Sequence, residues 1–172
     1  MPRNIEIKAR IASVDALLPR VAPLADRGPE LILQDDTFFA CPNGRLKLRA
    51  FPSGAGQLIF YARADQAGPK ESHYILSATA EPDSLRAALT AAWGENGRVR
   101  KTRTLFLVGR TRVHLDRVQG LGDFLELEVV LADGEPAQAG VAEAHALLGK
   151  LGITPGQLIE TAYVDLLRAA GA

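Results

Sequence analysis

The stretch NIEIKAR at positions 4–10 alternates strictly between polar and apolar side chains. Asn4, Glu6 and Lys8 share one parity, whereas Ile5 and Ile7 share the other. Because successive side chains of a β-strand point to opposite faces, this pattern predicts a strand with a carboxylate and an ammonium on the same face. A sheet of such strands has one apolar face and one charged face, and the fold must accommodate both.

Turn signals divide the rest of the chain into further strands. The sequences PNG at 42–44 and PSG at 52–54 are typical of turns, and apolar residues recur at helical spacing in 14–24 and 82–93. The remaining strand candidates are residues 31–40, 45–51, 57–64, 73–79, 98–108, 110–118 and 123–131. The order of elements therefore reads β-α-β-β-β twice.

Two units of four strands supply about eight strands, which is enough to close a barrel that holds a ligand inside. The part that follows is predicted to be helical, with one helix over residues 136–148 and a second over 155–169 that begins at Pro155 behind the N-cap Thr154. We interpret these helices as packing elements or as a cover on the barrel. The predicted fold class is α+β: an eight-stranded antiparallel β-barrel, or tunnel, with helices packed outside.

Charged residues repeat the alternation of the first strand in several other predicted strands. Arg45, Lys47 and Arg49 place three cations on one strand face, where they repel one another unless an anion neutralises them. The other polar members of these alternating runs are Tyr61, Arg63, Lys101, Arg103, Arg110, Arg112, His114, Asp116, Glu126 and Glu128. The acids cluster on the first and last strands.

Alternating charge on an antiparallel strand usually marks a face in water, and each of these strands taken alone fits that interpretation. Five such strands together favour a charged interior, because the opposite parity is rich in Leu, Ile, Val and Phe and suits helices packed on the outside. An ordinary barrel with solvated charges is the competing interpretation.

Length, charge and cysteine content indicate which classes of protein this chain can belong to. A chain of 172 residues fits one domain, residues 1–172, and its 20 basic and 20 acidic residues give no net charge that would favour nucleic acid or an anionic membrane. The single cysteine, Cys41, has no partner for an internal disulfide, and the charged first strand does not resemble a signal peptide. No apolar run approaches the roughly 20 residues that span a bilayer. We expect a cytoplasmic protein, monomeric or homodimeric, that binds neither nucleic acid nor membrane.

In a charged interior, the cationic and the acidic side chains would have different functions. Arginine and lysine side chains bind phosphate oxygens, while Glu6, Glu126 and Glu128 offer hard oxygen ligands for Mg²⁺ or Mn²⁺. Together they would stabilise the charge that develops in phosphoryl or nucleotidyl transfer. His114 is interpreted either as a general base or as a hydrogen-bonded structural histidine.

Other polar residues allow two interpretations as well. Tyr61 would either contact the substrate, by stacking on a base or bonding to a phosphate, or pack in the barrel wall. Asp35 or Asp36 could reach the tunnel, but turn or cap roles fit both residues best. Arg45 and Arg110 are expected at a tunnel mouth, in water.

Two motifs resemble the CYTH superfamily, the triphosphate tunnel enzymes that include class IV adenylyl cyclases and thiamine triphosphatases. NIEIK is similar to its N-terminal Glu-x-Glu-x-Lys hallmark. The stretch RTRVHLDRVQGLGDFLELEVVL, residues 110–131, resembles the class IV cyclase block, in which a strand ending in Asp leads through a Gly-Leu-Gly turn to a Glu-x-Glu strand. Asn4 departs from the hallmark because it replaces the first Glu.

The resemblance implies a charged tunnel that holds a triphosphate and one or two divalent metal ions, Mg²⁺ or Mn²⁺. By motif position, Glu6, Lys8, Glu126 and Glu128 would be catalytic, and Asp116 would join the three glutamates as a metal ligand or lie beside them. The residues implied to bind phosphate are Lys8, Lys47, Arg49, Arg63, Lys101, Arg103 and Arg112. Since the Asn4 amide brings no charge, one of the metal sites should be weaker or absent.

The sequence therefore predicts a metal-dependent enzyme that processes a triphosphate and is most similar to a class IV adenylyl cyclase, which converts ATP into cyclic AMP and pyrophosphate. Hydrolysis of inorganic triphosphate or thiamine triphosphate is the alternative reaction. A noncatalytic binder of nucleotides or polyphosphate, suggested by Asn4, is the alternative of a different class.

Overall fold

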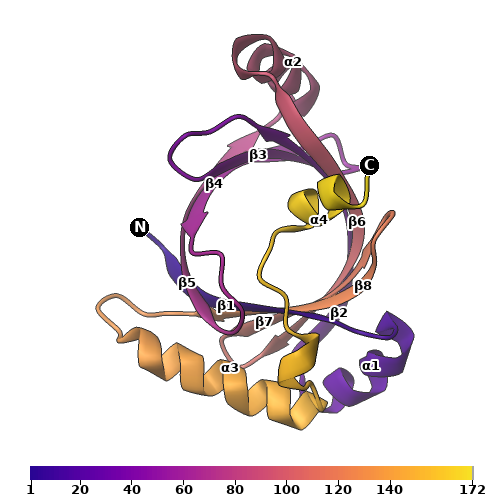
Figure 1. Cartoon of the computed structure of the whole chain (residues 1–172), viewed down its shortest axis with the longest axis vertical. Helices are drawn as coiled ribbons and strands as arrows, with labels where there is room; N and C mark the ends of the chain where they lie inside the picture. Colours follow the sequence, from indigo (N-terminus) through magenta and orange to yellow (C-terminus); the bar gives the residue numbers. More distant parts are fainter. Residues whose placement is uncertain (172) are drawn as a thin grey trace.

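The computed structural model describes residues 1–171 and closes eight strands into a barrel (Figure 1). Its order of elements confirms the β-α-β-β-β arrangement in both halves. The elements are β1 (Arg3–Arg10), α1 (Val14–Val21), η1 (Ala22–Leu24), β2 (Arg27–Phe39), β3 (Arg45–Ala50), β4 (Gly56–Arg63), β5 (Lys70–Thr79), α2 (Pro82–Trp93), β6 (Glu95–Val108), β7 (Thr111–Val118), β8 (Gly122–Val130), α3 (Ala137–Leu151), η2 (Pro155–Gln157) and α4 (Tyr163–Ala169).

The two units interlock instead of forming separate sheets. The strands follow one another around the barrel in the order β1-β5-β4-β3-β2-β6-β7-β8, and all neighbours are antiparallel. Strand β1 of the first unit therefore lies between β5 and β8 of the second, with Glu6 opposite Lys70 on one side and Glu128 on the other. This placement brings the Glu-x-Glu strand β8 directly beside the NIEIKAR strand.

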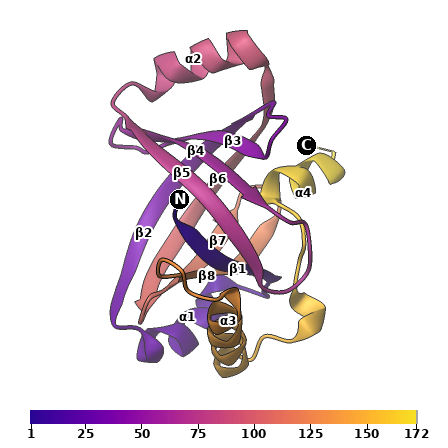
Figure 2. The same cartoon turned by 90° about the vertical axis from the view of Figure 1, so that its left-hand side faces the viewer.

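Apolar side chains of β1, β7 and β8 point outward and are covered by α1 and α3 (Figure 2). Ile5, Ile7 and Leu127 are at most 1% exposed in this layer. At Gly140 on α3 an added Cβ would lie 2.6 Å from Ile5 Cγ1, so the missing side chain lets the helix approach the barrel closely. On β1, β7 and β8 the apolar parity thus faces the helices and the charged parity faces the interior, as predicted, whereas the outward-facing Leu31, Leu33 and Ile75 of β2 and β5 are exposed.

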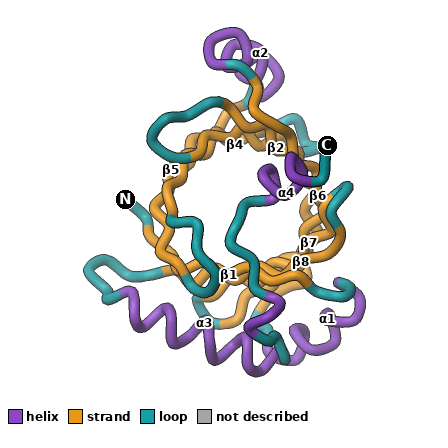
Figure 3. The backbone as a smooth tube through the Cα atoms, in the orientation of Figure 1, coloured by secondary structure: helices purple, strands orange, loops and turns teal. Residues whose placement is uncertain are grey.

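The prediction of one helix over residues 155–169 is wrong. The chain forms η2 and α4, and residues 158–162, named the strap here, cross the barrel opening as a loop between them (Figure 3). The Ile159 N–H donates to the Lys8 carbonyl at 3.0 Å, and Lys70 Nζ donates to the Glu160 carbonyl at 2.6 Å. The strap stays extended because these bonds to β1 and β5 replace the bonds of a helix. It covers one end of the barrel, as the sequence allowed.

Among the helices of residues 1–171, none combines the length and the apolar character required to cross a membrane.

Candidate active site

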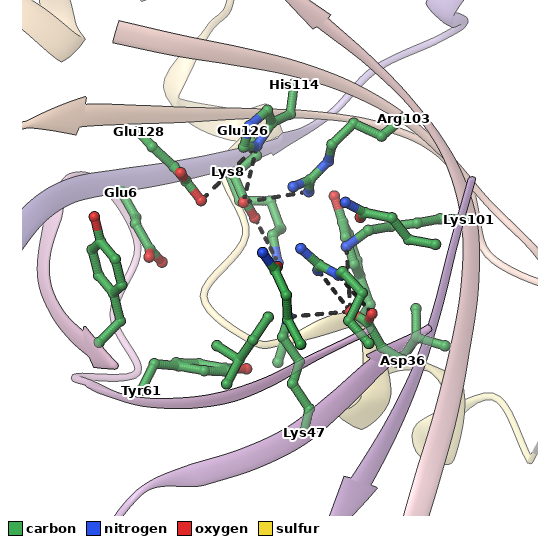
Figure 4. A pocket seen from close by; sticks show the side chains of 18 of the residues that line it. Glu6, Lys8, Asp36, Lys47, Tyr61, Lys101, Arg103, His114, Glu126 and Glu128 are labelled. Carbon is green, nitrogen blue, oxygen red and sulfur yellow. Dashed lines mark hydrogen bonds and ion pairs between the residues drawn. The ribbon is translucent and has the colours of Figure 1, made fainter. Parts of the chain in front are cut away.

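The barrel encloses a cavity of about 250 Å³ that is lined by side chains from all eight strands and from the strap (Figure 4). Seven cationic and four acidic side chains line it, which leaves an excess of three positive charges. The cations are Lys8, Lys47, Arg49, Arg63, Lys101, Arg103 and Arg112, and the acids are Glu6, Asp36, Glu126 and Glu128. The structure thus brings together every residue that the sequence assigned to phosphate binding.

Asp36 organises one side of the cavity. Its carboxylate is 1% exposed and accepts two hydrogen bonds from Arg49 at 2.8 Å each, while Lys47 Nζ lies 3.2 Å and Lys101 Nζ 3.9 Å from Oδ2. Burial alone would raise the pKa of Asp36, but Arg49 and Lys47 hold it well below its ordinary value. The turn or cap role expected for Asp36 is therefore wrong, since the residue holds three cations inside the tunnel.

The buried lysines have too few anionic neighbours to offset the effect of burial on their pKa values. Burial lowers the pKa of Lys47 to about 8 in spite of Asp36, and burial lowers the pKa of Lys101 well below its ordinary value. Burial also lowers the pKa of Lys8, which Glu126 partly restores. An anion in the cavity would stabilise the charged form of all three lysines.

Three glutamates gather on the β1 and β8 side of the cavity. Burial, together with the carboxylates of Glu126 and Glu128, raises the pKa of Glu6. Each of the three has a cationic neighbour: Arg63 Nη1 at 3.0 Å from Glu6, Lys8 Nζ at 3.3 Å from Glu126, and Arg112 Nε at 2.9 Å from Glu128. Closely spaced carboxylates of this kind favour a bound cation.

His114 lies beside these glutamates on β7. Its side chain is 5% exposed, and Nδ1 lies 3.5 Å from Glu126 Oε1 and 3.9 Å from Glu128 Oε1. Burial and the nearby Arg103 guanidinium lower the pKa of His114, which favours the neutral imidazole. Within residues 1–171, Nδ1 has no hydrogen-bond partner.

Asp116 is held away from the cavity, although its motif position implied a metal ligand or a neighbour of the ligands. The residue is fully buried and accepts hydrogen bonds from Arg103 Nε and Nη2 at 2.7 Å each. The Tyr163 hydroxyl donates to Oδ2 at 2.9 Å. Both carboxylate oxygens are thus engaged, and the observed contacts make Asp116 the residue that orients Arg103.

Tyr163, at the start of α4, is a cavity residue that the sequence reasoning missed. It is 5% exposed, and its ring centroid lies 3.8 Å from Lys8 Nζ and 5.1 Å from Lys101 Nζ. A tyrosine in an apolar C-terminal stretch looks like a packing residue, and the strap that places it under the lysines has no local sequence signal. Tyr61 also lines the cavity, with Lys47 Nζ 5.3 Å from its ring centroid.

Arg45 and Arg110 do not line the cavity. Arg45 Nη2 bonds to Asp165 Oδ2 at 2.5 Å and so ties α4 to β3. Arg110 lies on the outside of the barrel and pairs with Glu135 at 2.6 Å and Glu143 at 2.9 Å. Both arginines are therefore partly exposed, as expected, but each forms ion pairs and is not free in water.

Apolar and aromatic side chains also line the cavity. Among them are Ile32 on β2 and Tyr74 and Leu76 on β5. Leu76 is 53% exposed, so solvent reaches this residue of the lining. The cavity therefore offers apolar surface as well as charged groups.

Comparison with known proteins identifies the fold and the family. A CYTH domain model matches residues 2–163. The chain belongs to the CYTH family. Adenylate cyclase CyaB of Aeromonas hydrophila is 25% identical over 173 residues, a match that covers 95% of this chain and 87% of that one.

Solved structures share the CYTH fold over nearly their whole length. The PH1012 protein of Pyrococcus horikoshii superposes with a TM-score of 0.85 at 20% identity, over 95% of this chain and 98% of that one. An adenylate cyclase candidate of Vibrio parahaemolyticus gives a TM-score of 0.72 at 22% identity, over 96% and 97%. An adenylyl cyclase candidate of Hippeastrum, described with a dominant triphosphatase activity, gives 0.68 at 16% identity, over 99% and 96%.

Proposed function

We propose that the protein is a metal-dependent enzyme that binds a nucleoside triphosphate in its tunnel and converts ATP into cyclic AMP and pyrophosphate. The observation that carries this proposal is the buried cavity with an excess of three positive charges. Such a cavity is suited to a polyanion, because a polyanion places negative charge next to buried lysines that have too few anionic neighbours. The adenylate cyclase relative from Aeromonas supports the choice of ATP and of cyclisation.

The carboxylates of Glu6, Glu126 and Glu128 fit a divalent metal ion. They are hard oxygen donors, and burial, together with repulsion from the Glu126 and Glu128 carboxylates, raises the pKa of Glu6. Mg²⁺ and Mn²⁺ suit such donors, and a bound ion would neutralise phosphate charge in the tunnel.

The side chains of the tunnel have distinct tasks in cyclisation. A bond forms between the ribose O3′ and the α-phosphorus, and the bond from that phosphorus to the leaving pyrophosphate breaks. The group around Asp36, with Lys47 and Arg49, holds the phosphates that leave. The O3′ proton passes to a carboxylate, and Glu6 suits this task if Glu126 and Glu128 hold the metal ion, because burial raises the pKa of Glu6.

Apolar and aromatic side chains in the cavity support a triphosphate that carries an organic group. Tyr74 offers an aromatic face, and Ile32 and Leu76 offer aliphatic surface. A nucleobase gains binding free energy on surfaces of this kind, whereas inorganic triphosphate has nothing to place there. These side chains therefore favour ATP over inorganic triphosphate.

Hydrolysis is the second candidate reaction. It is favoured by the Hippeastrum structure, which shares the fold and was described with a dominant triphosphatase activity. Water would attack the terminal phosphorus of inorganic triphosphate or thiamine triphosphate, and the same cations would hold the chain of phosphates. A noncatalytic binder is the third candidate. Asn4 favours it, because its buried Oδ1 brings no charge to the tunnel and has no hydrogen-bond partner within residues 1–171.

A substrate panel separates these candidates. The protein is incubated with ATP, inorganic triphosphate or thiamine triphosphate, in Mg²⁺ or Mn²⁺, and the products are identified. Cyclic AMP with pyrophosphate supports the cyclase, orthophosphate alone supports the hydrolase, and tight binding without product supports the binder. The variants Lys8→Ala and Glu128→Ala should abolish turnover, whereas Glu135→Ala, which removes a carboxylate outside the barrel, should retain it.

A further inference from the structure

The His114 imidazole is buried with one ring nitrogen unpaired, which packing alone does not explain. Its side chain is 5% exposed, yet Nδ1 is buried without a hydrogen-bond partner within residues 1–171. Leaving a buried polar nitrogen unpaired costs free energy, so such atoms in folded proteins point to an ion or a ligand. Two carboxylate oxygens lie within 4 Å of Nδ1, one from Glu126 and one from Glu128.

The distances exclude an ordinary hydrogen bond from Nδ1 to either glutamate. The separations of 3.5 Å to Glu126 Oε1 and 3.9 Å to Glu128 Oε1 exceed the roughly 2.7–3.2 Å range of an N–H···O bond. The three side chains are nevertheless fixed relative to one another, because His114 on β7 lies directly opposite Glu126 on β8 and Glu128 follows two residues later.

The same distances suit donors that surround one metal ion. Ligand atoms of His114, Glu126 and Glu128 all lie within 4.8 Å of one another. In an octahedral site with ligands at about 2.1 Å, neighbouring ligands are about 3.0 Å apart and opposite ones about 4.2 Å. The separations from Nδ1 to the two carboxylates fall between these limits, and Figure 4 shows the ring and both carboxylates on the same side of the tunnel.

We propose that His114 Nδ1 binds the tunnel metal together with Glu126 and Glu128, and that this nitrogen donor makes the site prefer Mn²⁺ to Mg²⁺. Mg²⁺ takes oxygen ligands almost alone, whereas an imidazole raises the affinity of a site for first-row transition metals. The inference deepens the proposed function, on which the use of the metal in catalysis rests. The choice of metal itself is open to measurement without substrate.

Electron spin-echo spectroscopy of the Mn²⁺ complex tests the nitrogen ligand directly. The chain contains three histidines, and His73 and His145 are exposed and outside the cavity. A His73→Gln/His145→Gln protein, free of any affinity tag, therefore keeps His114 as its single imidazole. Mn²⁺ added to this metal-free protein should show ¹⁴N modulation, and His114→Gln in the same background should remove it. Absence of Mn²⁺ binding, or a bound Mn²⁺ without ¹⁴N modulation, overturns the proposal.

Calorimetry with Mn²⁺ and with Mg²⁺ tests the preference. His114→Gln should weaken Mn²⁺ binding about 10-fold or more and leave Mg²⁺ binding within about twofold. Glu128→Gln, which removes an oxygen donor, should weaken both. If His114→Gln weakens both metals equally, or neither, the proposal fails. If this variant does not fold, the spectrum of the His73→Gln/His145→Gln protein decides alone.

The test of the metal ligand and the substrate panel can succeed or fail separately. A ¹⁴N signal without any product would uphold the metal ligand and refute the proposed enzyme. Cyclic AMP from a protein without the ¹⁴N signal would uphold the enzyme and refute the ligand.

Discussion

Replacing Asp36 by Asn should destabilise the fold while preserving the shape of the site. The amide still accepts a hydrogen bond, but the negative charge among Lys47, Arg49 and Lys101 disappears. Breaking a buried ion pair by removing one partner costs about 3–5 kcal/mol. For a protein of this length about 1 kcal/mol shifts the melting temperature by roughly 2–4 °C. We therefore expect Asp36→Asn to melt about 6–20 °C below the parent protein.

The matched control is the neighbouring Asp35. Asp35→Asn makes the same chemical change one residue away, where the carboxylate pairs with Arg98 and Arg100 in partial contact with water. Exposed pairs contribute about 1 kcal/mol or less, so this variant should melt within about 4 °C of the parent. Differential scanning calorimetry at pH 7 measures both.

Inorganic triphosphate extends the test to binding. At a free concentration of about 100 times the dissociation constant, a ligand stabilises the folded state by about 2.7 kcal/mol. Because an anion compensates for the charge that Asp36→Asn removes, triphosphate should raise the melting temperature of this variant at least as much as that of the parent. Equal melting temperatures of the Asp35→Asn and Asp36→Asn proteins would refute the reasoning that Asp36 holds the tunnel cations.

Three further outcomes are expected. Tyr163→Phe removes the donor to buried Asp116 and should lower the free energy of unfolding in urea by about 1–3 kcal/mol; an unchanged urea midpoint would contradict this role. Lys47 has a pKa of about 8 in the folded protein, below the value of about 10.4 for an exposed lysine. Between about pH 8 and about pH 10.4 the unfolded chain therefore binds more protons than the folded one, and the free energy of unfolding should rise with pH in this range. Calorimetric affinity for inorganic triphosphate should instead fall above pH 8 as Lys47 loses its charge, and Lys47→Arg should reduce that fall; a flat profile of the parent would argue against it. Leu127→Ala, in the layer under α1 and α3, should cost about 2–5 kcal/mol without weakening triphosphate binding, because its side chain lies on the other face of β8.

The fold was predictable where a local pattern determines the structure. Alternation along β1, β3 and β8 specifies which side chains point inward, and each strand carries that information in its own residues. The strap was not predictable, because the Lys8 carbonyl that binds Ile159 lies far away in the sequence. A helix with the cap Thr154 was therefore the better local interpretation, and only η2 forms there.

The candidate site shows the same division. All seven residues assigned to phosphate binding line the cavity, since they share the inward parity of their strands. The roles of Asp36 and Asp116 were not, because they depend on which cation faces each carboxylate across the barrel. The sequence gives the sign of the charge on each side chain, whereas the partner of each charge depends on the register between strands.

The position of β1 between β5 and β8 has a consequence for the order of folding. Residue 4 pairs with residues 72 and 130, so the barrel closes through contacts that are distant in the sequence, and contacts of this kind form slowly. Until β8 docks, Glu6 and Lys8 lie on an open edge without Glu126 and Glu128 beside them. Pairing of β1 with β8 therefore brings Glu6 and Lys8 beside Glu126 and Glu128 in one step, and the first unit alone contains no part of the Glu-x-Glu strand.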